Sequence, residues 1–387
     1  MANKHTIGDL YQMQSLPLEA KIRMTQQRIK AWYDYFDGQV YVGFSGGKDS
    51  TVLVDIVKKM GYKDIPFVFA DTGLEYPEIR DFVKGYGKQV TWLRPKMVFK
   101  QVIEKYGYPF ISKEASDCIA PAKAYLKKMA EKENYKGDLL SLAKSKDKWD
   151  MPYRVSILLG QFESFWDKKK KGLMPKDGEL SKAKYQQTKW AMMLDAPFDV
   201  SNRCCDVMKK EPMHRYQKET GRYPITAQLA SESGMRTKKW LENGCNAFEL
   251  KAPISNPMSF WTEQDILLYI KKNHLPICSV YGDIVEDLDG TEEVEGQLTM
   301  SDIEGWENYD LFDAKRRPLK TTGCSRTGCM FCGFGCHLEK GEGRFERMKQ
   351  THPKQYDYIM RPWEEGGLNY KEIIDWLNEH GNLNIKY

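Results

Sequence analysis

The glycine turn at Ser45–Ser50 combines residue types that could bind a phosphate. It reads Ser-Gly-Gly-Lys-Asp-Ser, and its two glycines let the backbone bend so that successive N–H groups point into one concavity at a helix N-terminus. The common nucleoside triphosphate loop has four residues between its glycines and a Ser or Thr after its lysine. In this chain Gly43 and Gly47 enclose three residues, and Asp49 follows the lysine. The sequence therefore predicts a phosphate loop of a different kind.

Six of the nine cysteines form two groups that could bind a metal. They are Cys204, Cys205, Cys324, Cys329, Cys332 and Cys336. The N-terminus has no apolar stretch that could act as a signal peptide, so metal or redox chemistry explains the cysteines better than a disulfide framework does. Four thiolates favour zinc or an iron–sulfur cluster. Cys324, Cys329 and Cys332 have the plant ferredoxin spacing, but Cys336 is too close to be its fourth ligand.

The segments around the glycine turn predict how it is positioned. Gln39–Phe44 is rich in β-forming residues and runs straight into the turn, and the helical pattern after the turn ends at Gly61. Further strands are expected at Ile65–Ala70, Gln89–Arg94 and Tyr223–Ala230. Strands that alternate with helices at this spacing predict a parallel sheet with right-handed crossovers. The sequence thus predicts an α/β fold.

A second distinctive segment, Asp71–Glu75 (Asp-Thr-Gly-Leu-Glu), directly follows a predicted strand. It therefore lies at the carboxyl edge of the sheet, where ligands bind in open α/β folds. Together with the glycine turn it resembles the phosphoadenosine phosphosulfate reductase family, a branch of the adenine nucleotide α-hydrolase (PP-loop ATP pyrophosphatase) superfamily. Ser231–Arg236 is similar to the family's basic anion-binding segment, and Asn256–Ile270 is similar to its Pro-x-x-x-Trp-Thr-x-x-Asp helix. The resemblance covers about residues 35–340, apart from an insertion.

The resemblance implies a fold and a set of ligand-binding residues. The implied fold is a Rossmann-like parallel sheet, and the implied ligand is ATP, or an adenylyl sulfate nucleotide, with Mg²⁺. The residues implied to hold phosphates are Ser45, Gly46, Gly47, Lys48, Asp49 and Ser50. Asp71 and Thr72 would lie near the nucleoside, and Arg236 would meet a sulfate or pyrophosphate, for which its planar fork is suited. Lys48, Asp49 and Arg236 are the expected catalytic residues.

The resemblance also implies a ligand set for the cysteines. Iron–sulfur adenylyl-sulfate reductases pair two adjacent cysteines with a later Cys-x-x-Cys to hold a [4Fe–4S] cluster. The ligands implied here are Cys204, Cys205, Cys329 and Cys332. Adjacent cysteines cannot easily both reach one iron cube without strain, so Cys324 is the first substitute ligand and Cys336 is the next. Structural zinc is the alternative to the cluster.

One departure from the family pattern affects the expected reaction. Single-domain reductases of the family end in a mobile segment whose cysteine attacks the sulfonucleotide, whereas no cysteine follows Cys336 in this sequence. The cysteine-rich segment looks most like reductase-like sulfurtransferases of the DNA phosphorothioation type. The resemblance therefore implies an enzyme of sulfur metabolism that uses ATP and an iron–sulfur cluster for adenylation-dependent sulfur transfer to a nucleic acid or another acceptor.

Two other functions remain open. One is a sulfonucleotide reductase that acts on phosphoadenylyl or adenylyl sulfate with a partner thiol. The other is a nucleotide-binding accessory protein that has a structural zinc and no turnover. The partners expected for sulfur transfer are an adenine nucleotide, a nucleic-acid acceptor and a cysteine desulfurase or thiol reductant, but the sequence does not identify the acceptor or the sulfur donor.

Length and composition predict the overall organisation. The chain has 387 residues, of which 41% are hydrophobic and 29% charged, which excludes a wholly disordered chain. We expect a helical segment at 1–36, a nucleotide-binding domain at 37–255 with a helical insertion at about 123–195, and a cysteine-rich, helical C-terminal region at 256–387. No apolar run approaches the roughly 20 residues of a membrane helix, so we expect no membrane partner and a cytoplasmic protein, with a homo-oligomer as its assembly.

The expected insertion carries basic and aromatic residues in alternation. Its lysines are Lys127, Lys128, Lys168–Lys171, Lys182, Lys184 and Lys189. Interleaved with Trp149, Trp166 and Trp190, they could form a basic face on which nucleic-acid bases stack, or simply a solvated helix surface. The net charge of +5 is too small to decide between these interpretations.

Overall fold

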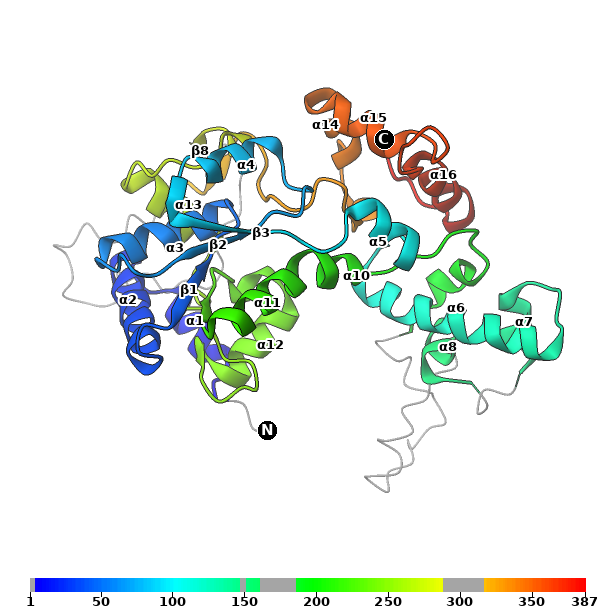
Figure 1. Ribbon diagram of the computed structural model, residues 1–387, viewed down its shortest axis with the longest axis horizontal. Helices are drawn as coiled ribbons and strands as arrows, with labels where there is room; N and C mark the ends of the chain where they lie inside the picture. Colours follow the sequence, from blue (N-terminus) through cyan, green and yellow to red (C-terminus); the bar gives the residue numbers. More distant parts are fainter. Residues whose placement is uncertain (1–3, 147–150, 161–185, 288–316) are drawn as a thin grey trace, which may run out of the picture. The chain divides into compact units, whose positions relative to one another are not determined.

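The computed structural model describes residues 4–146, 151–160, 186–287 and 317–387 (Figure 1). The chain divides into two compact units, each built from two separate stretches of sequence. Unit 1 comprises Met1–Lys96 and Lys209–Cys329, and unit 2 comprises Met97–Met208 and Met330–Tyr387. These divisions fall at other positions than the expected domain boundaries near residues 36 and 255. The expected insertion belongs to a unit that already begins at Met97.

A six-stranded sheet with the order β3-β2-β1-β5-β7-β6 forms the centre of unit 1. Its strands are β1 (Val40–Gly43), β2 (Phe67–Ala70), β3 (Val90–Leu93), β5 (Tyr223–Ile225), β6 (Asn246–Ala247) and β7 (Ile254–Ser255). Neighbouring strands are parallel except for β6 and β7, which are antiparallel. In the register, Val42 lies beside Phe67 on one side and Ile225 on the other. The expected α/β fold with a mostly parallel sheet is confirmed.

The strand expected at Tyr223–Ala230 is shorter in the structure. It ends at Ile225, and the chain then leaves the sheet for the short 3-10 turn η5 (Ala230–Glu232). Leu229 and Ala230 are buried, so their apolar character reflects packing in the core and not continuation of the strand. The early exit carries the following residues over the carboxyl edge of the sheet.

Helices cover both faces of the sheet in unit 1. On one face, α2 (Leu18–Tyr35) and α3 (Lys48–Lys59) pack against the side chains of Val40, Val42 and Phe67. On the other face, α11 (Glu211–Thr220) covers Tyr41 and Val68. Successive side chains of a strand point to opposite faces, so the alternating apolar residues of β1 and β2 fill both layers.

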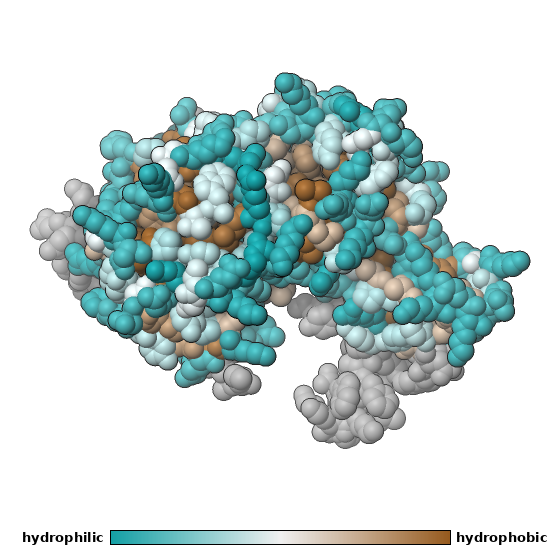
Figure 2. Space-filling view, in the orientation of Figure 1, coloured by the Kyte–Doolittle hydropathy of each residue, from teal (hydrophilic) through white to brown (hydrophobic). Residues whose placement is uncertain are grey.

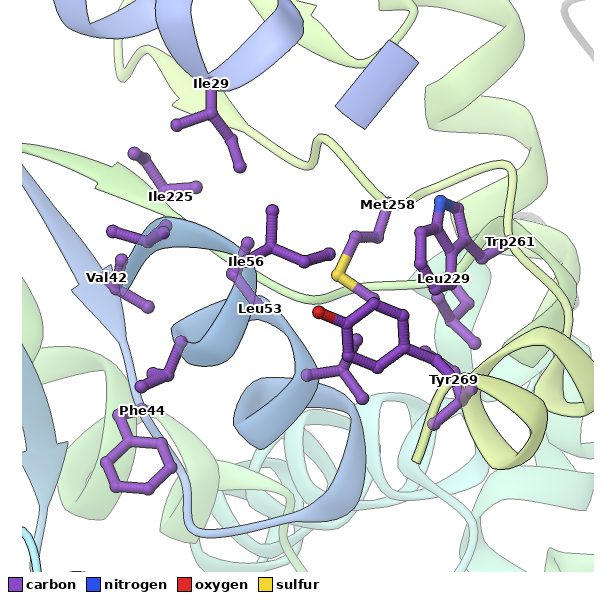
Figure 3. Packing of buried hydrophobic residues seen from close by; sticks show 14 of the residues in the cluster. Ile29, Val42, Phe44, Leu53, Ile56, Ile225, Leu229, Met258, Trp261 and Tyr269 are labelled. Carbon is purple, nitrogen blue, oxygen red and sulfur yellow. The ribbon is translucent and has the colours of Figure 1, made fainter. Parts of the chain in front are cut away.

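The larger core of unit 1 joins segments that are far apart in sequence. Figure 3 shows Ile29 of α2, Val42 of β1, Leu53 and Ile56 of α3, and Ile225 of β5 converging in one cluster. All five side chains are at most 1% exposed. This cluster fixes the start of α3, and with it the glycine turn that precedes the helix.

The helix α13 (Glu263–Lys272) begins with a capping box. The Thr262 hydroxyl accepts the Asp265 N–H, and the Asp265 carboxylate accepts the Thr262 N–H at 2.7 Å. The Asp265 carboxylate also accepts a hydrogen bond from the Lys21 ammonium group at 2.7 Å, and Lys21 is 2% exposed. This buried ion pair ties the start of α13 to α2.

The remaining elements of unit 1 surround the sheet. They are α1 (Ile7–Gln14), α4 (Pro77–Lys84), η1 (Gly87–Gln89), α12 (Gly234–Asn243), η6 (Ser279–Tyr281), β8 (Ile284–Glu286) and β9 (Leu319–Thr321). β8 and β9 pair antiparallel, with Val285 opposite Lys320. This pairing brings the segment after β9 back to the residues around Tyr281, because the Gly323 N–H donates to the Tyr281 carbonyl at 2.9 Å.

Unit 2 is mainly helical and has a small parallel sheet of its own. Its α-helices are α5 (Phe99–Tyr106), α6 (Lys113–Glu133), α7 (Leu139–Ser145), α8 (Tyr153–Leu158), α10 (Arg203–Cys205), α14 (Arg344–Thr351), α15 (Pro353–Met360) and α16 (Tyr370–Gly381). The sheet joins β4 (Phe110–Ile111) to β10 (Gly333–Phe334). Phe110, Phe345 and Tyr370 are fully buried and form its aromatic centre. The Tyr370 hydroxyl donates to the Phe331 carbonyl at 2.6 Å, which anchors the cysteine-rich segment.

Hydrophilic side chains cover most of the face seen in Figure 2. Large hydrophobic residues that are exposed, such as Tyr11, Met235 and Leu338, are scattered among the described residues. Among these residues, no helix combines the length and apolar character needed to cross a membrane.

Candidate functional site

The glycine turn lies between β1 and α3, at the carboxyl end of a central strand of the sheet. Gly46 adopts φ +71°, a left-handed conformation that favours glycine. A Cβ at this position would lie 2.8 Å from a methyl group of Val83 and 2.9 Å from one of Ile79, both on α4. The turn is therefore closed against α4, and a larger residue at position 46 would open it.

Two serines brace the turn from inside. The hydroxyls of Ser45 and Ser50 lie 3.0 Å apart, and the Ser50 hydroxyl donates to the Gly47 carbonyl at 2.9 Å. The Thr51 hydroxyl donates to the same Gly47 carbonyl at 3.0 Å. Gly47 is the N-cap of α3, so the N–H groups after it belong to the first turn of a helix, where anions bind.

Lys48 is the buried cation of the turn, with 2% of the residue exposed. Its ammonium group donates to the Ser325 carbonyl at 3.0 Å and lies 3.2 Å from a carboxylate oxygen of Glu263. Asp49 is also near, at 3.9 Å. Burial raises the pKa of Asp49, the charge of Glu263 raises it further, and Lys48 opposes both.

The segment after β2 lies at the same edge of the sheet. Asp71 is 6% exposed and accepts a hydrogen bond from the Arg80 guanidinium at 2.9 Å. The Thr72 hydroxyl donates to the Glu75 carboxylate at 2.8 Å. The structure therefore brings the two segments predicted from the sequence to one edge of the sheet. The polar groups of Asp71 and Thr72 are already hydrogen-bonded there, to Arg80 and Glu75.

A cavity of about 330 Å³ opens between the ends of β1 and β2. Its lining includes Ser45 from the turn, Ala70 and Glu75 from the second segment, and Met213 and Gln228 from the part of unit 1 that follows residue 208. This volume is at the lower end of the range for small-molecule sites. The cavity adjoins the glycine turn, because Ser45 belongs to its lining.

Arg236, the predicted anion-binding arginine, lies near the same loop. It belongs to the first turn of α12, where the Ser233 hydroxyl caps its backbone N–H. Its guanidinium pairs with Glu232, which also pairs with Arg326. Burial lowers the pKa of Arg236, the charge of Arg326 lowers it further, and the charge of Asp49 raises it.

Sequence reasoning missed several residues that contact the glycine turn. The backbone N–H of Lys48 donates to the hydroxyl of Tyr281 at 3.1 Å, and that hydroxyl lies 2.6 Å from the hydroxyl of Thr327. Ser325 and Glu263 contact the Lys48 ammonium. For Glu263, the capping box at the start of its helix was the available signal. For Tyr281 and Thr327 no local spacing points to the contact, because β8 and β9 create it.

The predicted metal ligands fall in both units. Cys204, Cys205 and Cys332 belong to unit 2, whereas Cys329 is the last residue of unit 1. Burial raises the pKa of Cys332, and the charge of Cys205 adds to this effect. Burial raises the pKa of Cys336 to about 12, with a contribution from Cys332. The substitute ligand Cys336 therefore lies in the same part of unit 2 as Cys332, which is itself near Cys205.

Cys324 belongs to unit 1, as Cys329 does. It is 8% exposed, and its sulfur is 4.0 Å from the Tyr76 hydroxyl. All nine cysteines are within the described residues and none forms a disulfide. Within the parts of the chain that the structure describes, no group of three or more His, Cys, Asp and Glu side chains is arranged to hold a metal ion. The ligand set therefore remains a prediction.

The expected basic face is only partly covered by the described residues. Lys168–Lys171, Lys182, Lys184, Trp149 and Trp166 lie outside them. Trp190 is 6% exposed and packs edge-on against His337, so its ring is not free to stack on a base. Lys127 lies 3.7 Å from the carboxylate of Asp199. The nucleic-acid interpretation loses one of its three stacking residues and otherwise remains a prediction.

Comparison with known proteins gives a family match over most of the chain. The family model of the phosphoadenosine phosphosulfate reductase domain matches residues 39–137 and 172–333, which is well over half of the sequence. Among solved structures, phosphoadenylyl-sulfate (PAPS) reductase from Candida auris, in its phosphate complex, aligns at 13% identity over 72% of this chain and 92% of that chain, with a TM-score of 0.33.

Two curated relatives match over shorter stretches. The uncharacterized proteins MJ0066 and MJ0973 of Methanocaldococcus jannaschii are 40% identical over 118 residues and 36% identical over 112 residues. These stretches cover 29% and 26% of this chain, and 24% and 26% of the relatives. The chain therefore spans about a quarter of the length of the curated relatives that it matches.

Proposed function

Because the chain belongs to the phosphoadenosine phosphosulfate reductase domain family, we propose that its glycine turn binds the phosphates of ATP or an adenylyl sulfate nucleotide. The observation that carries the proposal is the position of Ser45–Ser50 at the N-terminus of α3, with the ammonium of Lys48 beside it. The adjoining cavity of about 330 Å³ would take the nucleoside, near Asp71 and Thr72. Membership of the family explains why the loop has this sequence. The carboxyl edge of the sheet explains why the loop and the cavity lie together.

The carboxylates near Lys48 suit the Mg²⁺ that accompanies ATP. Asp49 and Glu263 both face the Lys48 ammonium in the structure. Mg²⁺ prefers oxygen ligands and usually takes one or two carboxylates together with substrate phosphates. When Lys48 turns to a phosphate, these two carboxylates would be left to hold the metal.

The reaction that we propose is adenylation followed by sulfur transfer. An acceptor oxygen attacks the α-phosphorus of ATP, the bond to the β-phosphate oxygen breaks, and pyrophosphate leaves while still held by the turn. Lys48 and Arg236 would stabilise the negative charge that builds up on the departing phosphates. A sulfide nucleophile then attacks the acceptor atom that carries the adenylated oxygen. The bond between this atom and the oxygen breaks, AMP leaves with the oxygen, and the acceptor keeps the sulfur.

Four thiolates have the donor chemistry for a [4Fe–4S] cluster or for zinc. We propose Cys204, Cys205, Cys329 and Cys332 as the ligands. If one of the adjacent pair does not bind, Cys324 is the first substitute and Cys336 is the next. A bound cluster would supply or carry the sulfur for transfer. Support comes from the proximity of three cysteines in unit 2. The charge of Cys205 raises the pKa of Cys332, and the charge of Cys332 raises the pKa of Cys336.

The partners belong to the same proposal. A nucleic acid would be the acceptor, and a cysteine desulfurase or a thiol reductant would deliver sulfur or electrons. We also propose a cytoplasmic, homo-oligomeric protein with no membrane partner.

Nucleotide binding tests the core of the proposal. ATP with Mg²⁺ is titrated into the full-length protein by calorimetry, and exchange of labelled pyrophosphate into ATP is followed with and without nucleic acid. Lys48→Ala should weaken ATP binding by about ten-fold or more, since it removes a charge-assisted contact. Lys59→Ala is the matched control, because Lys59 lies at the far end of α3 and pairs with Asp55. An unmodified protein that does not bind ATP would contradict the proposal.

The other two functions are outcomes of parallel measurements. Release of sulfite from adenylyl sulfates would establish a sulfonucleotide reductase. Tight nucleotide binding without turnover, together with one zinc and no sulfide per chain, would establish an accessory protein. About four irons and four sulfides per chain after anaerobic purification would support the cluster.

A further inference from the structure

Two arginines at the phosphate loop share a single carboxylate. Arg236 pairs with one oxygen of Glu232, and Arg326 pairs with the other. The side chain of Glu232 is 18% exposed, whereas those of Arg236 and Arg326 are 37% and 53% exposed. Glu232 is also fixed by the Leu229 N–H, which donates to it at 3.1 Å. Two guanidinium groups are therefore paired with one carboxylate whose position is fixed by the backbone.

The segment that carries Arg326 is held on the glycine turn from both sides. Before it, the Ser325 carbonyl accepts from the Lys48 ammonium at 3.0 Å. After it, the Thr327 hydroxyl lies 2.6 Å from the Tyr281 hydroxyl, which accepts the Lys48 N–H at 3.1 Å. Arg326 thus has anchors on both neighbouring residues, and its position relative to the loop is determined by the fold of unit 1.

This anchoring depends on the β8–β9 pairing. The Cys324 N–H donates to the Val280 carbonyl at 2.9 Å, which continues the pairing up to the residue before Ser325. A Cβ at Gly323 would lie 2.4 Å from the same carbonyl, so the two backbones approach closely. Glycine at position 323 permits this approach, and the segment from Ser325 onward is delivered to the loop.

The charges at the loop are balanced among themselves in the structure. The cations are Lys48, Arg236 and Arg326, and the anions are Asp49, Glu232 and Glu263. The field of Arg326 reaches both Asp49 and Arg236, since it acts on the pKa of each. Both guanidinium groups therefore lie within electrostatic range of the place where phosphates would bind.

We propose that Arg326 and Arg236 together bind the outer phosphates of a nucleoside triphosphate, and that Glu232 occupies this two-arginine site until the ligand arrives. The inference rests on the proposed nucleotide binding and narrows it to ligands with a pyrophosphate group. Guanidinium forks match phosphate oxygens in pairs, and a pyrophosphate group carries more negative charge than one carboxylate. It can therefore displace Glu232, whereas AMP carries no pyrophosphate group that could do so.

Removing one arginine tests the site. ATP, AMP and inorganic pyrophosphate are titrated by calorimetry into the full-length protein and into Arg326→Ala. We expect affinity for ATP and for pyrophosphate to fall by about ten-fold or more, and affinity for AMP to change by less than about two-fold. Arg347→Ala is the matched control, since Arg347 pairs with Glu342 in unit 2. Equal losses for ATP and AMP, or no loss for either, would overturn the inference.

A second variant should gain affinity. Glu232→Gln removes the competing charge and keeps an oxygen that can accept the Leu229 N–H, so pyrophosphate should bind several-fold more tightly. Adding Arg326→Ala to this variant should abolish the gain, as in a double-mutant cycle. Weaker pyrophosphate binding by Glu232→Gln would overturn the inference. If the unmodified protein bound no ATP, the proposed function itself would fail. If the unmodified protein bound ATP and the variants bound it with the same affinity, only the two-arginine site would be refuted.

Discussion

At the scale of single residues, the charged groups at the glycine turn already have partners. Lys48 is held by Ser325 and Glu263, and Arg236 is held by Glu232. The contacts of Lys48 keep a buried charge paired, which avoids the high cost of an isolated buried charge. A ligand must therefore exchange partners with the loop, so its affinity depends on what it displaces as well as on what it contacts.

Gly46 tests the backbone of the loop. Gly46→Ala should lower the free energy of unfolding by about 1–3 kcal/mol and weaken ATP binding, because φ is +71° and the added Cβ would meet Ile79 and Val83 within 3 Å. Gly61→Ala is the control, since φ is +84° there but no atom lies within 4 Å of the added Cβ. It should keep ATP binding. Equal urea midpoints for the two variants would contradict the expected role of the contact with α4.

Asp49 links stability to function through its ionisation. Its folded-state pKa is raised, mainly by burial, so the folded protein favours the protonated form more than the unfolded chain does. Above the raised pKa, the charged carboxylate therefore destabilises the fold, and this effect disappears as the pH falls below the unfolded value of 3.8.

Removing this charge has an expected sign. Asp49→Asn should raise the melting temperature at pH 7, lose that advantage at pH 4, and weaken binding of Mg²⁺ with ATP. Thermal unfolding at both pH values, with Asp55→Asn on the same helix as the comparison, measures the effect. A lower melting temperature at pH 7 would show that the ion pair with Lys48 outweighs burial.

At the scale of elements, helix starts position the charged groups of the site. α3 begins within the loop, α12 presents Arg236 in its first turn, and α13 presents Glu263 as its first residue. Each start is fixed by a cap or a turn and not by the length of the helix. Changes at helix caps should therefore move charges at the loop as well as alter stability.

The capping box of α13 provides the test. Thr262→Ala should reduce the free energy of unfolding by about 1 kcal/mol, since the hydroxyl that accepts the Asp265 N–H is lost. Thr262→Ser keeps the hydroxyl and should keep most of the stability. Because Glu263 follows directly, Thr262→Ala should also change the Mg²⁺ dependence of ATP binding. Urea unfolding and titrations at several Mg²⁺ concentrations check both expectations, and an effect as large in Thr262→Ser would contradict them.

At the scale of the whole molecule, each compact unit is assembled from distant parts of the chain. Unit 1 joins Met1–Lys96 to Lys209–Cys329, and unit 2 joins Met97–Met208 to Met330–Tyr387. The six grouped cysteines are spread over three of these four stretches. Two are on α10, two follow β9 in unit 1, and two belong to the second stretch of unit 2. Any metal bound by them would connect sequence-distant segments, so metal binding should stabilise the fold as well as supply chemistry.

Single cysteine replacements test the predicted cluster. Cys332→Ser should lower iron and acid-labile sulfide well below about four per chain, because a serine oxygen is a poor substitute for a thiolate. Cys118→Ser is the control, since Cys118 is a half-buried cysteine of α6 in unit 2 with no predicted role. Equal iron contents in both variants would remove Cys332 from the ligand set. Loss of iron in Cys336→Ser, but not in Cys205→Ser, would identify Cys336 as the replacement.

Local sequence determined the parts of this protein whose signals lie within a few residues. The loop Ser45–Ser50, the strands β1 to β3 and the capped start of α13 could all be predicted, because glycine turns, alternating apolar residues and capping boxes are short-range patterns. The family resemblance rests on the loop, on Asp71–Glu75, on Ser231–Arg236 and on the segment that contains the start of α13. Arg236 was predicted from this resemblance, because it lies within the matching segment Ser231–Arg236.

Only the tertiary structure decided which other groups meet the loop. Tyr281, Arg326 and Thr327 lie far from it in sequence and reach it through the β8–β9 pairing. The same holds for the early end of β5, where packing of Leu229 in the core prevailed over strand propensity. The physical reason is that these positions depend on burial and on hydrogen bonds between distant segments, which no local spacing encodes.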